Sequence, residues 1–306
     1  MRLAGIDCGT NSIRLLIADA ADGGLTDVVR EMRVVRLGEG VDRTSQLLPA
    51  ALERTRVALA GYAAAIAAHG AERVRMIATS ATRDAHNRAE FVEMVRAVLG
   101  VAPEVISGAE EAALSFAGAA SGLPGVSGQL LVADIGGGST ELVLGEACAP
   151  AALRSHSMDV GCVRMTERHL ADDPPTPQQI QAVVDDVRTA LITAASAIDL
   201  TGSATFVGVA GTVTTIAAIA LDLDRYDADA VHGSVLSAAQ VRDVTARLLA
   251  MTHDERAALP VMHPGRVDVI SAGALVLRTL LEATGARAVI ASEHDILDGI
   301  ALSLLR

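Results

Sequence analysis

The sequence of 306 residues contains no lysine, so all 25 of its basic residues are arginine. Without lysine the chain cannot use a P-loop lysine, a Schiff base or a lysine general base. Any phosphate charge that it binds must be met by arginine, backbone N–H groups or a metal ion. The net charge of −12 argues against a general nucleic-acid-binding protein, so we expect no nucleic acid among its partners.

Aromatic residues are also scarce. There is no tryptophan, and aromatics make up 2% of a chain that is 51% hydrophobic, so its core must be aliphatic. Cys8, Cys148 and Cys162 are an odd number without metal-ligand spacing, which fits a reducing cytoplasm, and Cys8 is expected to be a packing residue. Because no uninterrupted apolar run could span a membrane and no signal peptide opens the chain, we expect a cytoplasmic protein without membrane contact.

The chain length fits two domains better than one, and the pattern of elements repeats after a Gly-, Ser- and Pro-rich linker at 121–128. Strands are predicted at 3–7, 13–18, 27–36, 73–79, 104–106, 129–134, 140–145, 151–157, 204–209 and 288–291. Helices are predicted at 49–70, 88–99, 109–119, 176–198, from about 212, at 237–251, 264–283 and 295–305. Thr176, followed by Pro177 and Gln179, predicts a capping box. We therefore expect an α/β fold of two related domains, 1–124 and 125–306, and leave open whether the last helix packs back on the first domain.

One pattern occurs twice, each time after a buried strand and before a second strand. Asp7-Cys8-Gly9-Thr10-Asn11-Ser12 and Asp134-Ile135-Gly136-Gly137-Gly138-Ser139 both read Asp-x-Gly-x-x-Ser. Glycine lets backbone N–H groups approach phosphate oxygens, and the carboxylate can hold Mg²⁺ directly or through water. The sequence therefore predicts two phosphate clamps that face each other across an interdomain cleft, with Asn11 and Ser12 in the first clamp and Asp7 as a metal ligand.

The second clamp is the stronger signal, because three successive glycines would weaken an ordinary hairpin and indicate a close approach. Asp134 and Glu141 flank this turn and can both face a cation, although a glycine-rich hairpin with solvated acids is the alternative. Another glycine turn, with Gly208, Gly211 and Thr212, stands between a strand and a helix, and a helix N-terminus binds anions. Taken alone, a tight structural turn explains that segment equally well.

Three charged residues are further candidates. Ser107 and Glu110 fit a capping box, which explains Glu110 structurally but leaves Glu111 unexplained. We nominate Glu111 to orient and deprotonate water, while a solvated glutamate that favours the helix dipole is an equal alternative from spacing alone. Arg83 and Arg266 are candidate phosphate ligands, although a single arginine after a strand is more often a surface residue.

Together these motifs resemble the exopolyphosphatase and guanosine pentaphosphate phosphatase family, which belongs to the fold group of sugar kinases, heat-shock chaperones and actin. The matching segments run in the expected order along nearly the whole chain, at 5–12, 36–41, 78–85, 106–112, 134–141 and 208–212. The resemblance implies two actin-like, ribonuclease H-like domains. The chain is similar to the short form found in actinobacteria, without the C-terminal helical domains of longer members.

The resemblance also implies hydrolysis of a terminal phosphoanhydride bond with Mg²⁺, or Mn²⁺, as cofactor. Inorganic polyphosphate is the expected substrate, and guanosine pentaphosphate (pppGpp) is the alternative, because both end in the same bond. By motif position, Glu111 matches the family's catalytic glutamate, and Asp134 and Glu141 match its metal and phosphate-site acids. The phosphate loops of the family match Gly136, Gly137, Gly138, Ser139, Gly208, Gly211 and Thr212.

Two other classes compete with this interpretation. The fold group would allow an actin-like or sugar-kinase-like ATP-binding protein, against which stand the Glu110-Glu111 pair and the breadth of the resemblance. A non-catalytic sensor of phosphate-rich ligands would require loss of the catalytic glutamate or the metal acids, and these are present. Apolar faces on the C-terminal helices are compatible with a homodimer.

Overall fold

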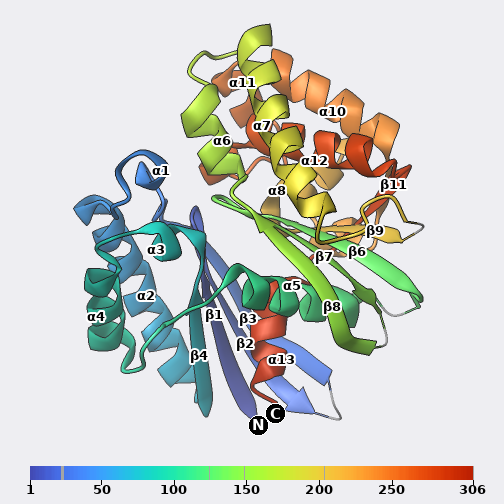
Figure 1. Ribbon diagram of the computed structural model, residues 1–306. Coiled ribbons are helices and arrows are strands. Elements are labelled where there is room, and N and C mark those ends of the chain that lie inside the picture. Colours follow the sequence, from blue (N-terminus) through green and yellow to red (C-terminus); the bar gives the residue numbers. More distant parts are fainter. Residues whose placement is uncertain (22–23, 124, 148, 203, 306) are drawn as a thin grey trace. The chain divides into compact units, whose positions relative to one another are not determined.

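The computed structural model describes residues 1–21, 24–123, 125–147, 149–202 and 204–305. The chain forms two compact units, labelled by their elements in Figure 1. The first consists of Met1–Gly118 with Ile296–Arg306, and the second of Ala119–Asp295. The division therefore falls inside helix α5 (Gly108–Gly122), before the linker that was expected to end the first domain at 124, and the last helix lies in the first unit. Pro124 of that linker and Cys148 lie outside the described residues.

The first unit contains a five-stranded sheet in the order β3-β2-β1-β4-β5. Its strands are β1 (Arg2–Cys8), β2 (Ser12–Ala21), β3 (Gly24–Val34), β4 (Arg73–Ala78) and β5 (Glu104–Val105). The first three strands pair antiparallel, whereas β4 and β5 continue parallel to β1. β1 is buried almost throughout, which explains its nearly continuous apolar sequence.

The second unit repeats this order. β8 (Ala149–Met158), β7 (Thr140–Glu146), β6 (Gln129–Ile135), β9 (Thr205–Val209) and β11 (Ala288–Ala291) correspond in turn to β3, β2, β1, β4 and β5, and their pairing directions are the same. A short strand, β10 (Val235–Ser237), adds to the edge antiparallel to β11. The predicted α/β fold with two related halves is confirmed.

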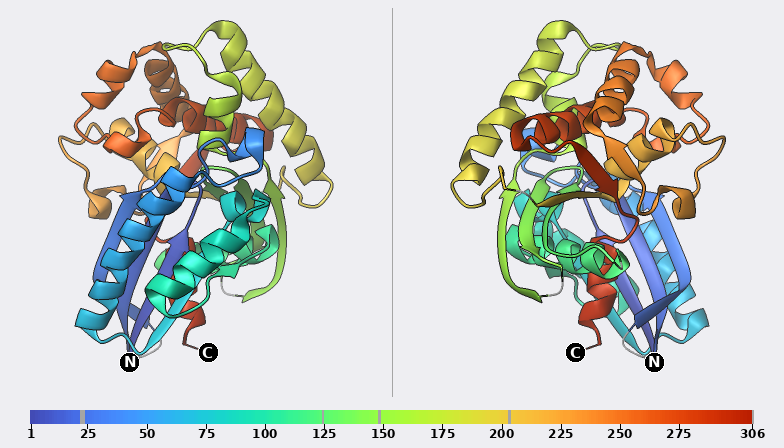
Figure 2. Two further views of the ribbon diagram at one scale, coloured as in Figure 1. Left: turned by 90° about the vertical axis from the view of Figure 1, so that its left-hand side faces the viewer. Right: turned by 90° about the vertical axis from the view of Figure 1, so that its right-hand side faces the viewer.

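Helices cover both faces of the first sheet. The first unit contains α1 (Val41–Thr44), α2 (Pro49–His69), α3 (Ser80–Asp84), α4 (Arg88–Leu99), the start of α5, and α13 (Ile296–Ser303). Because side chains alternate along a strand, β1 and β2 present one set of apolar residues to the core that contains Tyr62 of α2 and Phe91 of α4. The other set, which includes Leu16 and Ala18, meets α13, which runs across this face in Figure 2.

Gly299 lets α13 approach α5 closely. A Cβ at this position would lie 2.0 Å from the carbonyl oxygen of Leu114, and backbone cannot move aside as a flexible side chain can. We expect Gly299→Ala to lower the free energy of unfolding of the first unit by about 2–3 kcal/mol, the upper part of the usual range for an overpacked core. Thermal and urea unfolding would measure the loss. Gly24→Ala is the matched control, since its Cβ would meet nothing closer than 3.9 Å, and equal stability of the two variants would contradict the prediction.

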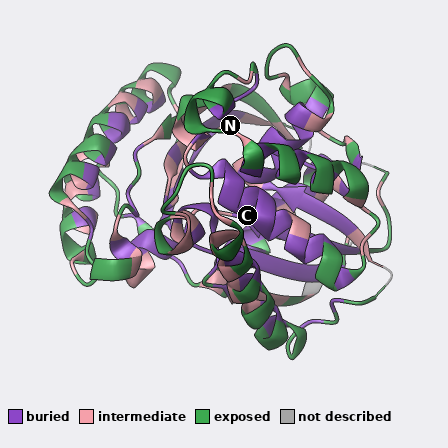
Figure 3. Ribbon diagram, turned by 90° about the horizontal axis from the view of Figure 1, so that it is seen from above, coloured by how far each residue is buried: buried purple, intermediate pink, exposed green. Residues whose placement is uncertain are grey.

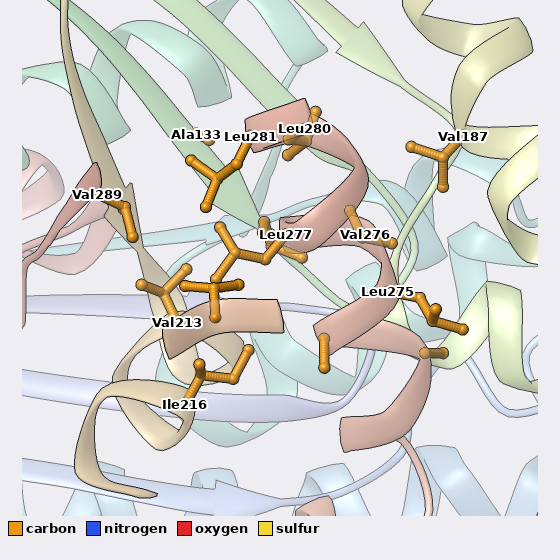
Figure 4. Packing of buried hydrophobic residues seen from close by; sticks show 14 of the residues in the cluster. Ala133, Val187, Val213, Ile216, Leu275, Val276, Leu277, Leu280, Leu281 and Val289 are labelled. Atoms are coloured by element: carbon orange, nitrogen blue, oxygen red, sulfur yellow. The ribbon is translucent and has the colours of Figure 1, made fainter. Parts of the chain in front are cut away.

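The core of the second unit is built around α12 (Ile270–Thr284), which is buried on nearly all sides. Figure 4 shows its leucines packing with Val213 and Ile216 of α8 (Ala210–Ala220), together with Ala133, Val187 and Val289. The other helices of this unit are α6 (Cys162–His169), α7 (Pro177–Ala195), α9 (Ala228–Val231), α10 (Ala238–Ala250), α11 (His253–Ala257) and a 3₁₀ turn, η1 (Pro264–Arg266). In Figure 3 the outer helices alternate between buried and exposed colours, as amphipathic covering helices do.

Every strand and helix predicted from the sequence is present, with ends shifted by a few residues. The capping box at Thr176 is confirmed: its hydroxyl accepts from the N–H of Gln179 at 3.3 Å, and its own N–H donates to the Gln179 side chain at 3.1 Å. The helix expected from 264 begins only at Ile270, after the 3₁₀ turn. The sequence analysis missed α1, α3, α6, α9, α11 and β10, which are too short for hydrophobic periodicity to show them.

Candidate active site

The site-bearing segments of the first unit follow strands that end side by side. Cys8 at the end of β1 pairs with Ala78 of β4, which pairs with Val105 of β5. The turn after β1, the start of α3 and the start of α5 therefore emerge at the carboxyl ends of neighbouring strands. In open α/β sheets this edge is where ligands bind.

The two Asp-x-Gly-x-x-Ser segments form the same turn. In each, the N–H of the first glycine donates to the carbonyl of the serine at 3.0 Å, from Gly9 to Ser12 and from Gly136 to Ser139. In the first unit the carbonyl of Asn11 also accepts from the N–H groups of Val35 and Arg36. The segment after β3 thus braces the turn that carries the predicted ligands Asn11 and Ser12.

The acids at the start of the two turns have different partners. Asp7 stands opposite Arg14 across the β1–β2 hairpin, and Nη2 of Arg14 lies 2.7 Å from its carboxylate. The corresponding pair in the second unit is Asp134 opposite Glu141, and both carboxylates are buried. The hydroxyl of Ser157 donates to Glu141 at 2.7 Å. The first hairpin thus places an arginine opposite its acid, whereas the second places a buried glutamate opposite a buried aspartate.

Glu111 lies in the first turn of α5, directly beside Arg83 of α3. Nη1 of Arg83 donates to the Glu111 carboxylate and to the carbonyl of Ile106, both at 2.9 Å. The Arg83 side chain is 24% exposed, and among the described residues no hydrogen bond uses its Nε or Nη2. Two predicted site residues therefore come together, and Arg83 both orients Glu111 and keeps donors for a ligand.

The neighbouring Glu110 has a separate, structural role. Its N–H donates to the hydroxyl of Ser107 at 3.2 Å, as the predicted N-cap requires. Its carboxylate does not return to the Ser107 backbone but accepts from Arg75 at 2.8 Å, so the second half of the predicted capping box is wrong. The Glu110 side chain is 46% exposed in this ion pair, whereas Glu111 is buried.

The glycine loop of the second unit rests on the first turn of α6. The N–H of Cys162 donates to the carbonyl of Gly136, and the N–H of Val163 to that of Gly137, both at 2.9 Å. Nε of Arg164 donates to the carbonyl of Gly138 at 2.6 Å. All three loop carbonyls therefore face α6.

These hydrogen bonds to the loop carbonyls also fix the direction of the N–H group in each of the same peptides. In a trans peptide the C=O and the following N–H point in opposite directions, so the N–H groups of Gly137, Gly138 and Ser139 point away from α6. Within the described part of the chain no hydrogen bond uses these three donors. A row of oriented, unused backbone N–H groups is an anion-binding concavity.

Of the predicted residues around α8, Gly211, Thr212 and Arg266 lie together at the start of the helix, whereas Gly208 has a packing role. Nη1 of Arg266 donates to the carbonyl of Gly211 at 3.0 Å, and a Cβ at Gly211 would lie 2.1 Å from Nη2 of Arg266. Thr212 is buried in the same helical turn, and no side chain within the described part of the protein caps this helix end. Gly208 is explained by packing instead, because its Cβ would meet Val213 at 2.8 Å.

The buried cysteines are packing residues. Burial raises the pKa of the Cys8 thiol and of the Cys162 thiol, which keeps both protonated and poorly nucleophilic. Cys8 thus behaves as predicted. Four residues that the sequence analysis missed also shape the site: Arg14, Ser80, Gly161 and Arg164. Of these, Ser80 hydrogen-bonds Thr10 of the first turn at 2.8 Å.

Among the described residues there is no group of three or more His, Cys, Asp or Glu side chains placed to enclose a metal ion. Mg²⁺ does not need such a cage, because it keeps several waters and binds through one or two carboxylates together with substrate phosphates. Asp134 and Glu141 fit that mode. The described helices include none that is long and apolar enough to cross a membrane.

Comparison with known proteins gives consistent results along the whole chain. A family model described as the Ppx/GppA phosphatase family matches residues 16–306. Exopolyphosphatase 2 of Mycobacterium tuberculosis is 52% identical over 316 aligned positions, covering 99% of this chain and 98% of that protein. The guanosine-5'-triphosphate,3'-diphosphate pyrophosphatase of Vibrio atlanticus is 34% identical over 71% of this chain and 43% of its own length.

Solved structures agree with these matches. An exopolyphosphatase-like protein superposes with a TM-score of 0.94 at 45% identity, covering 99% of this chain and 97% of the other. The Ppx/GppA family member of Aquifex aeolicus gives 0.83 at 31% identity, with 100% and 97% covered. An exopolyphosphatase from Cytophaga hutchinsonii gives 0.92 at 25% identity, with 100% and 98% covered.

Proposed function

The chain belongs to the Ppx/GppA phosphatase family, and we propose that it is an exopolyphosphatase that cleaves the terminal phosphoanhydride bond of inorganic polyphosphate and releases orthophosphate. The observation that carries this proposal is the row of unused N–H groups at Gly137, Gly138 and Ser139, which suits a phosphate group. In a chain without lysine, backbone donors, arginine and a metal ion must supply this binding.

Each unit has its own part in the proposed reaction. In the first, Glu111 orients a water molecule and accepts its proton as the oxygen attacks the terminal phosphorus, and Arg83 holds the Glu111 carboxylate in place. In the second, the loop 136–139 and the start of α8 with Arg266 bind phosphate oxygens. The bond between the terminal phosphorus and the bridging oxygen breaks. Orthophosphate is released, and the remaining polyphosphate is one unit shorter.

We further propose that Asp134 and Glu141 hold the divalent cation. Like charges directly opposite each other on one face of a sheet destabilise it, and a bound cation removes that cost. Mg²⁺ supplies charge stabilisation for the phosphoryl group in transfer. A role for Asp7 in holding the metal, and the use of Mn²⁺, stay predictions.

Removing either acid should weaken Mg²⁺ binding. We expect Asp134→Asn and Glu141→Gln each to raise the Mg²⁺ concentration for half-maximal activity by at least about tenfold, because each substitution deletes an anionic oxygen ligand. Calorimetric titration with Mg²⁺ gives the same comparison without turnover. Glu146→Gln is the control, because Glu146 lies at the exposed end of β7, the strand that carries Glu141. Metal affinities equal to that of the control would exclude Asp134 and Glu141 as metal ligands.

A pppGpp 5'-phosphohydrolase is the second candidate, because guanosine pentaphosphate ends in the same bond and relatives named as its pyrophosphatases match most of this chain. The deciding experiment measures orthophosphate release with Mg²⁺ from short-chain polyphosphate, long-chain polyphosphate and pppGpp. Release from polyphosphate supports the proposal, and release from pppGpp alone makes the protein an alarmone phosphatase. Release from none, with ATP bound or consumed in a parallel assay, would favour the ATP-binding or kinase class. A cytoplasmic location and a homodimer remain predictions.

A further inference from the structure

The three peptides of the loop 136–139 are not held in the same way. The carbonyls of Gly136 and Gly137 accept from backbone N–H groups of α6, which any residue except proline would supply at those positions. The carbonyl of Gly138 accepts from a side chain, Nε of Arg164, at 2.6 Å. The orientation of the last peptide, and with it the Ser139 N–H, therefore depends on a side-chain donor at position 164.

The position of Arg164 suits this task. It lies in the first turn of α6, half-buried, and its own backbone N–H donates to Gly137 at 3.1 Å. The main chain and the side chain of Arg164 thus hydrogen-bond to two successive peptides of the loop, through the carbonyls of Gly137 and Gly138. A charged donor to a carbonyl makes a shorter and stronger bond than a neutral one.

We propose that Arg164 is a positioning residue for substrate binding: it holds the Gly138–Ser139 peptide so that the Ser139 N–H faces the phosphate. This inference rests on the proposed phosphate-binding role of the loop. Arg164 thus affects substrate binding by holding the Gly138–Ser139 peptide, and its charge does not contact the substrate directly.

Two substitutions separate these actions. Gln Nε2 is bonded to Cδ, as Arg Nε is, so Arg164→Gln keeps a donor at the same position while it removes the positive charge. Arg164→Met has a similar length and no donor. Arg168→Met is the control, because Arg168 lies on the same helix and pairs with Asp186 at 2.8 Å.

We expect Arg164→Met to raise KM for the hydrolysed substrate about tenfold with a smaller change in kcat, which is the effect of losing one charge-assisted hydrogen bond. Arg164→Gln should stay within about threefold of the wild type, and Arg168→Met should be unchanged. Calorimetric titration with inorganic tripolyphosphate in the presence of Ca²⁺ should show the same order of affinities. Equal melting temperatures of the variants exclude loss of folding as the cause.

An unchanged Arg164→Met variant would overturn the proposal. So would an Arg164→Gln variant as weak as Arg164→Met, because the charge itself would then be what matters. Failure of the proposed function is distinguishable, since a wild-type protein that hydrolyses neither polyphosphate nor pppGpp can still bind tripolyphosphate in a manner that depends on Arg164.

Discussion

Replacing Glu111 by glutamine should lower kcat for orthophosphate release by about 10²–10⁴-fold, the usual contribution of a general base. Glutamine has the same size, and its amide oxygen can still accept from Nη1 of Arg83, so the helix and the guanidinium should stay in place. What is lost is the ability to take a proton from water. We therefore expect substrate affinity to remain within a few-fold of the wild type.

Glu110→Gln is the matched control for this result. The two glutamates are adjacent in the first turn of α5, but Glu110 is exposed and paired with Arg75, so its substitution should leave kcat within about twofold. Phosphate release over time and equilibrium binding of tripolyphosphate are the two measurements. A rate for Glu111→Gln close to that of Glu110→Gln would exclude Glu111 as the base, and a loss of binding instead of rate would make its role structural.

The second large effect is expected from Gly161→Ala. Gly161 caps α6 with φ −152 and ψ 164, a backbone conformation open to any residue, so conformational strain is not the reason for glycine here. The reason is contact: an added Cβ would lie 2.3 Å from the carbonyl oxygen of Gly137 and 2.6 Å from the nitrogen of Gly138. The loop must shift to make room. Because a displacement of about 1 Å in a positioning group can cost 10²-fold, kcat/KM should fall by at least that factor.

Gly202→Ala provides the comparison for Gly161→Ala. Its Cβ would approach nothing closer than 3.5 Å, and it lies at the opposite end of β9 from α8. Both variants should fold, which circular dichroism and melting temperature can verify. If Gly161→Ala keeps the kcat/KM of the control, the loop does not need its present position, and phosphate binding by the loop 136–139 would have to be abandoned.

Local sequence patterns were enough to predict most elements of the fold. The buried strands β1 and β6 read as apolar runs followed by acids and glycines, and the repeated Asp-x-Gly-x-x-Ser pattern does form one turn twice, with the same hydrogen bond. Helix ends such as Thr176 were predictable because capping involves residues only three positions apart. The division of the chain was harder to predict, since α5 runs through it and the terminal α13 lies with the first unit.

By itself, the sequence determined that any bound phosphate must be met without lysine, that two similar α/β halves would form, and that Glu111, Asp134 and the glycine loop were candidates. Only the tertiary structure decided what supports them. Arg83 reaches Glu111 from 28 positions away, and Arg164 holds Gly138 from 26 positions away. These supports lie on α3 and α6, helices too short to show a hydrophobic period, and their contacts join segments that meet only after the strands have paired. A pattern along the chain records local geometry, whereas the orientation of a peptide or a carboxylate depends on neighbours that the fold brings together.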